Sequence, residues 1–128
     1  MAQTEIAGVP TPEVIAFAEL MNELEMQHVE MFGDSVNTAI VTNVKAADLK
    51  GRSVSIRGLS RVVGLQPSTI RRRVLNLVEQ GWLVQDETGV HFPESARERG
   101  APKVRKAMLR FAHALNRLGW GDFRPPAR

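Results

Sequence analysis

The stretch of residues 53–81 constrains the fold of this chain more than any other part of the sequence. It runs SVSIRGLSRVVGLQPSTIRRRVLNLVEQG, two helix-like patterns separated by a glycine and a proline. Ser55 is a favourable N-cap for a short helix over 56–63, and Gly64 suits the left-handed backbone position that ends a helix. The stretch therefore predicts two helices joined by a tight turn.

The second helix of this pair should begin at Pro67, because proline is tolerated best at the first position of a helix. We expect it to continue to about Gln80 and to stop at Gly81. Apolar residues at helical spacing define one buried face. Those residues are Ile70, Val74, Leu77 and Val78.

The opposite face of the second helix carries hydroxyl, amide and guanidinium groups. A major groove accepts such a helix, because base edges and phosphates are hydrogen-bond acceptors. An arginine triplet can also be an ordinary solvated surface, but its place in a two-helix unit favours DNA binding. The candidate DNA-contacting residues here are Ser68, Thr69, Arg71, Arg72, Arg73 and Asn76, with Arg57 on the preceding helix.

A β-hairpin is predicted directly after this helix. Two short apolar runs, 82–85 and 90–93, flank a connection that contains Gly89. A hairpin in this place is the wing of a winged helix-turn-helix, so we expect a mainly α fold with one small β-hairpin. His91 is a further candidate for DNA contact, although a plain surface role is the more ordinary interpretation.

Further helices are predicted on the N-terminal side of this unit. Thr11 caps a helix that continues to about Met31, and Asp34 caps one to about Leu49 that would support the pair from behind. Residues 53–55 are compatible with one small strand.

On the C-terminal side, a short helix over 94–99 should end at Gly100, and Pro102 should begin a last helix to about Leu118. That last helix has a narrow apolar seam with steps of four and three residues. We interpret the seam as a subunit contact, with intramolecular packing as the alternative. The candidate dimerisation residues are Phe17, Leu20, Leu24, Met108, Phe111, Leu115 and Leu118.

The expected organisation is a flexible arm, one winged-helix domain and an irregular basic tail. The arm covers 1–10, the domain 11–118 and the tail 119–128; the DNA-binding core is 34–93, between dimerisation helices at 11–32 and 94–118.

The charges of the chain are distributed unevenly. Its 128 residues have a formal net charge of +3. Residues 1–48 contain eight acidic residues and one lysine, whereas residues 49–128 contain sixteen basic and six acidic residues. A basic region of this size attracts polyanions such as DNA. Two oppositely charged halves can also pair with each other, so charge alone does not decide.

Several function classes find no support in the sequence. The chain has no cysteine, and no apolar run approaches the ~20 residues of a membrane span. The N-terminus lacks the order of a signal peptide, so we expect a cytoplasmic protein with no membrane partner. Glu25 and His28 have a spacing found in metal sites but no partner motif. We expect no enzyme activity, no metal and no cofactor.

The predicted order of helix, helix, strand, helix, recognition helix, hairpin and helix resembles the multiple-antibiotic-resistance-regulator (MarR) family of winged-helix transcription factors. Segment 56–84, IRGLSRVVGLQPSTIRRRVLNLVEQGWLV, is similar to the centre of that family. The resemblance implies a homodimer with two recognition helices on a pseudo-palindrome, and a small-molecule effector of unidentified kind. The wing tip over 86–89 is acidic, where the family usually has Asp-x-Arg.

The leading hypothesis is a homodimeric, sequence-specific regulator of transcription that binds double-stranded DNA with helix 67–80 in the major groove. One alternative is a winged helix used for protein–protein interaction without DNA affinity. Another is a plasmid or phage DNA-binding protein for replication or partition.

Overall fold

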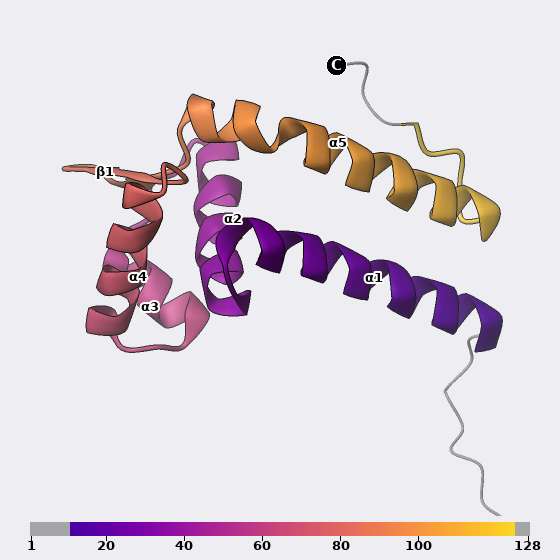
Figure 1. Ribbon diagram of the computed structural model, residues 1–128, viewed down its shortest axis with the longest axis horizontal. Coiled ribbons are helices and arrows are strands. Elements are labelled where there is room, and N and C mark those ends of the chain that lie inside the picture. The colour runs from indigo at the N-terminus through magenta and orange to yellow at the C-terminus, as the bar shows by residue number, and fades with distance from the viewer. Residues whose placement is uncertain (1–10, 125–128) are drawn as a thin grey trace, which may run out of the picture. The chain divides into compact units, whose positions relative to one another are not determined.

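The computed structural model describes residues 11–124, except for the side chains of Thr11 and Glu13. The predicted arm over 1–10 and the last four residues of the predicted tail lie outside this range. The described residues form five helices and one two-stranded antiparallel hairpin (Figure 1), which confirms the predicted mainly α fold. The elements are α1 (Thr11–Phe32), α2 (Ser35–Leu49), α3 (Ile56–Val63), α4 (Pro67–Glu79), β1 (Val84–Asp86), β2 (Gly89–His91) and α5 (Glu94–Arg117).

The chain divides into two compact units, each described by itself. The first, here called the winged-helix unit, comprises residues 27–102. The second, here called the terminal-helix unit, comprises residues 1–26 and 103–128, of which 11–26 and 103–124 are described. Among the described helices, none combines the length and apolar character that crossing a lipid bilayer requires.

The core of the winged-helix unit is built from the inner faces of α2, α3 and α4. Helix α4 contributes the apolar face that its spacing predicted, with three of the four residues fully buried and Val78 partly buried. Trp82 closes the core after α4, and its ring lies edge-on to Phe32 with 4.9 Å between centroids. The other large, fully buried residues of this core are Ile40, Val41, Val44, Leu59, Leu83 and Val90.

Local signals set the ends of the helices as expected. The Ser55 side chain accepts a hydrogen bond from the Gly58 backbone N–H at 2.9 Å, and Gly64 ends α3 in the left-handed region with φ 82°. Asp34 caps α2 by accepting from the Asn37 N–H at 2.8 Å. These contacts are local, and they fix the start of α2 and both ends of α3.

Both strands of the wing are shorter than predicted and lie closer to the turn that connects them. Trp82 and Leu83 are buried in the core, and β1 begins only at Val84. Asp86 pairs with Gly89, so two residues connect the strands. The predicted strand over 53–55 is a single bridge, in which the Val90 N–H donates to the Val54 carbonyl at 2.8 Å.

The prediction of two helices after the wing is wrong, because α5 is continuous through Gly100 and Pro102. An interior proline removes one backbone hydrogen bond of a helix and crowds the carbonyl four residues earlier, so Pro102 weakens α5 locally without ending it. Gly100 is buried, and a Cβ there would lie 3.4 Å from the Met31 side chain and 4.0 Å from Trp82. These are ordinary van der Waals distances, so Gly100 is a packed interior residue of α5 and does not end a helix.

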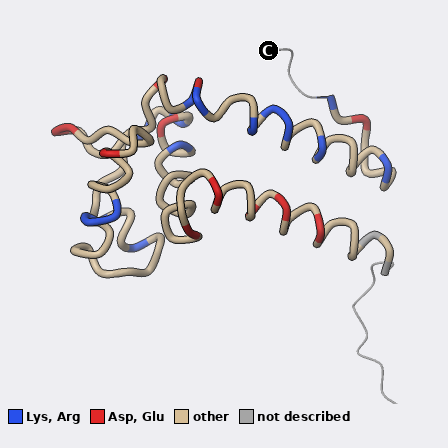
Figure 2. Tube along the Cα trace, in the orientation of Figure 1, with Lys and Arg blue, Asp and Glu red and all other residues tan. Residues whose placement is uncertain are grey.

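In the terminal-helix unit, the described segments of α1 and α5 lie side by side and antiparallel (Figure 1). Leu20 and Ala112 are buried. Phe17 and Trp120 contact each other with 6.2 Å between ring centroids, and Arg110 forms an ion pair with Glu23. Acidic residues recur along α1 and basic residues along α5 (Figure 2), so the two helices have complementary charges.

Candidate nucleic-acid interface

The outer face of α4 presents a polar and basic surface from a rigid helix. Ser68, Arg71, Arg72 and Asn76 are exposed, and Thr69 is partly buried. The N-cap residue Gln66 makes no side-chain capping bond within the structure. Because the first backbone N–H groups of a helix point outward, they add hydrogen-bond donors at the end of α4 that carries the serine.

A second basic contribution comes from α3. Arg57 and Arg61 are exposed on this helix, which packs against α4 through the buried Leu59. Figure 2 shows basic residues on both helices of the pair. The helix pair therefore offers guanidinium groups from two elements, which suits simultaneous contact with base edges and phosphates.

Arg73 differs from its two neighbours because it is held inside the winged-helix unit. Its Nη1 donates to the Asp34 carboxylate, with which it forms an ion pair, and lies 3.3 Å from Asn37 Oδ1. Asp34 is also the N-cap of α2, and its pKa is lowered by the Asn37 N–H and by the Arg73 guanidinium. This arginine therefore ties α4 to the start of α2.

His91 is likewise engaged within the unit. Its Nδ1 lies 3.0 Å from Asp48 Oδ1 on α2, and its Nε2 lies 2.7 Å from Thr88 Oγ1 and 3.3 Å from Asp86 Oδ1. The second oxygen of Asp48 accepts from the Phe92 N–H at 2.6 Å. Hydrogen bonding to Asp48 is the main cause that raises the pKa of His91, and Asp86 adds to it. The imidazole thus fastens the wing to the end of α2.

This contact predicts a pH-dependent stability. The pKa of His91 is raised in the folded chain, so protonated His91 stabilises the fold fully below its unfolded pKa of about 6.5, and this contribution is lost as pH rises through the folded value. We expect the free energy of unfolding of the unsubstituted chain, measured with urea from pH 5.5 to 9, to fall as His91 loses its proton. The His91→Gln variant should lack this part of the fall. His113→Gln, on an exposed histidine of α5, is the control. Equal pH profiles for both variants would contradict the assignment.

The tip of the wing is acidic and contains no lysine or arginine. Asp86 and Glu87 are exposed, and the Asp86 carboxylate accepts from the Thr88 N–H at 2.8 Å. Hydrogen bonds from Thr88 lower the pKa of Asp86. A carboxylate that stays charged repels phosphate, so the electrostatics of this unit favour DNA contact through α3 and α4 rather than through the wing tip.

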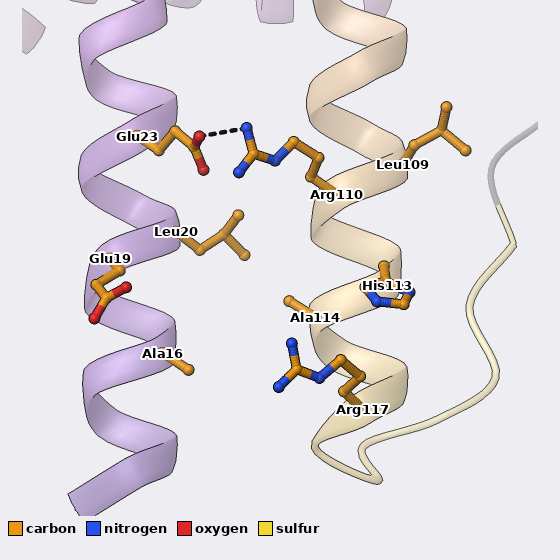
Figure 3. Close-up of a pocket in the computed structure, with 9 residues that line it drawn as sticks. All are labelled: Ala16, Glu19, Leu20, Glu23, Leu109, Arg110, His113, Ala114 and Arg117. Atoms are coloured by element: carbon orange, nitrogen blue, oxygen red, sulfur yellow. Dashed lines mark ion pairs between the residues drawn. The ribbon is translucent and has the colours of Figure 1, made fainter.

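The terminal-helix unit contains an open groove of about 580 Å³ between α1 and α5 (Figure 3). Arg110 and Glu23 form their ion pair in this groove, and Arg117 extends toward α1. Its lining residues are Ala16, Glu19, Leu20, Glu23, Leu109, Arg110, His113, Ala114 and Arg117.

The predicted dimerisation residues are unequally exposed in the single chain. Leu20 is buried, whereas Phe17 and Met108 are 38% and 42% exposed and are accessible to a partner. The partly buried ones are Leu24, Phe111, Leu115 and Leu118. Across residues 11–124, no three histidine or acidic side chains form a group that could hold a metal ion.

Sequence reasoning missed three features of this site. It assigned Asp34 to capping alone, it gave Asp48 no role, and it did not single out Leu75, which is 51% exposed on α4. The contacts of both aspartates span 39 to 44 residues along the chain, so no local pattern signals them. The exposure of Leu75 was detectable, because its helical position lies between Arg71 and Arg72 and away from Ile70 and Leu77.

A helix pair with a basic outer helix and a short hairpin defines a winged helix-turn-helix, a class in which the second helix enters DNA. A comparison with protein families agrees with this class. Residues 49–87, from the end of α2 through α3 and α4 into the wing, match the model of the IclR helix-turn-helix domain. This match indicates a DNA-binding regulator of transcription, and it does not point to the MarR family. Searches of curated proteins and of solved structures found no match.

Proposed function

We propose that this protein is a homodimeric transcription regulator that binds specific double-stranded DNA sequences with α4 in the major groove. The observation that carries the proposal is the pair of exposed guanidinium groups, Arg71 and Arg72, within the span that matches a DNA-binding domain. Arginine forms bidentate hydrogen bonds with guanine and strong bonds with phosphate, so this helix can both recognise and hold a duplex.

The other predicted contacts divide by their environment. Ser68, Asn76 and Arg57 are exposed and can donate to DNA without rearrangement, and Thr69 is partly buried beside them. Arg73 and His91 already bind carboxylates. We assign them the weakest contacts: the remaining donors of Arg73 suit a phosphate at the edge of the interface.

A dimer built by the terminal-helix unit completes the proposal, in a MarR-like arrangement. The side chains that support it are Phe17, Met108 and their exposed apolar neighbours Ile15, Met21 and Leu109. A two-helix unit with this much exposed apolar surface gains stability by burying it against a second copy. Two recognition helices on one pseudo-palindrome would follow, in a cytoplasmic, non-enzymatic protein whose effector is not specified by these residues.

The test is selection of bound duplexes from a random pool, combined with the mass of the protein–DNA complex in solution. We expect a palindromic consensus bound by two chains, with affinity that falls steeply as salt increases, because phosphate contacts release counterions. A consensus without symmetry and one chain per duplex would remove the dimer. Absence of any enriched sequence at moderate salt would remove the DNA-binding function.

One observation favours a second candidate, a winged helix that binds another protein. The acidic wing tip, with Asp86 and Glu87 exposed, matches a basic protein surface better than a phosphate backbone. This candidate predicts no duplex affinity in the same selection, and loss of partner binding when both residues are replaced by asparagine and glutamine.

A further inference from the structure

An exposed leucine lies beside the arginines of the basic face of α4. Leu75 is 51% exposed, although Ile70, Val74 and Leu77 of the same helix are fully buried. At ~100° per residue, Leu75 lies within about 60° of Arg72 around the helix axis. It lies equally close to the partly buried Val78, so Leu75 stands on the flank of the outer face of α4, between Arg72 and the edge of the core-facing side.

The residues around Leu75 argue against an apolar docking patch. On its own helix, the positions one turn before and after it are Arg71, Arg72, Val78 and Glu79; Val78 is partly buried against the core, and the other three are exposed and charged. Patches that bind proteins are contiguous and apolar, whereas the exposed positions one turn from Leu75 on this helix are charged. A partner that fits it combines hydrogen-bond acceptors and charge with one small apolar group at a defined distance.

The major groove has that combination, because thymine presents a methyl group beside the acceptors of neighbouring bases. Leu75 is three residues after Arg72, which is roughly 4.5 Å along the axis of α4 at the rise of a helix. This is comparable to the ~3.4 Å between adjacent base pairs, so the two side chains can reach successive base pairs of a duplex.

We propose that Leu75 is a specificity-determining residue that contacts the 5-methyl group of a thymine, one base step from the position that Arg72 contacts. The inference rests on the proposed DNA-binding function and adds a chemical requirement to it. Each half-site then contains a thymine whose methyl group contributes to affinity, next to a guanine or another acceptor-rich base.

The experiment uses the full chain and the duplex obtained by selection, with each thymine replaced in turn by deoxyuridine, which removes only the methyl group. For the unsubstituted protein, we expect affinity to fall about fourfold at one position of each half-site, from ~0.8 kcal/mol per buried methyl. For the Leu75→Ala variant, replacing the same thymine by deoxyuridine should cause no further loss of affinity. Val62→Ala, which shortens an apolar side chain 64% exposed on α3, should behave like the unsubstituted chain.

The outcomes separate the two proposals. The methyl contact is refuted if deoxyuridine lowers the affinity of the unsubstituted chain and of Leu75→Ala equally at every position. It is also refuted if deoxyuridine lowers neither affinity at any position. In both cases the proposed DNA binding stands. If Leu75→Ala changes the number of chains in solution without changing the deoxyuridine profile, Leu75 is a protein contact instead. If the selection enriches no duplex, the proposed function itself fails. Because Leu75 is half exposed, the variant should keep its fold, which far-ultraviolet circular dichroism checks.

Discussion

Replacing Arg72 by alanine should weaken binding to the selected duplex by about 1–3 kcal/mol, a factor of roughly 5 to 150. The reason is that its exposed guanidinium is centred on the outer face of α4 and has no carboxylate partner in the ion pairs of the described residues. If Arg72 contacts a base, specificity at one position should relax. If it contacts a phosphate, affinity should fall for all sequences, with a salt slope reduced by about one.

The matched control for this variant is Arg97→Ala. Arg97 is an exposed arginine on α5 that forms a surface ion pair with Glu94, so its loss should barely change the fold. Fluorescence anisotropy at two salt concentrations distinguishes the two variants. Equal affinity of Arg72→Ala and the unsubstituted chain would refute the assignment of Arg72.

Replacing Gly89 by alanine should destabilise the wing by about 2–3 kcal/mol, because two costs add at this position. The backbone has a φ of 137°, which L-residues with a side chain rarely adopt, and an added Cβ would lie 2.5 Å from the Val54 carbonyl oxygen. That oxygen accepts the Val90 N–H and cannot move away without losing the bridge. Thermal unfolding and amide exchange at Val90 measure the effect.

Gly51→Ala separates the two costs of the Gly89 substitution. Gly51 also has a positive φ, 71°, but nothing lies within 4 Å of an added Cβ. This control should cost about 1 kcal/mol from backbone strain alone. If Gly89→Ala were no more destabilising than Gly51→Ala, the close approach of Val54 would not constrain the wing.

Much of the DNA-facing unit was predictable because its signals are local. Ser55, Gly64 and Pro67 act within one helical turn of themselves, so their effect on chain direction does not depend on distant residues. The apolar spacing of α4 then determined which side is buried and, by elimination, which side carries arginine.

The errors and omissions arose where packing between distant residues decides. Gly100 and Pro102 have the character of a helix boundary, yet α5 continues through both, with Gly100 buried beside Met31 and Trp82. The link between His91 and Asp48 spans 43 residues, and a single sequence contains no sign of it. Recognition of a binding helix is therefore easier than recognition of the side chains that hold it in place.

Asp34 gives one carboxylate control over two helices. Its side chain caps the N-terminus of α2 by accepting the Asn37 N–H, and it holds the flank of α4 through Arg73. Neutralising this one acid should therefore have two effects at once: the start of α2 loses its cap, and the Arg73 guanidinium on the flank of α4 is freed for another anion.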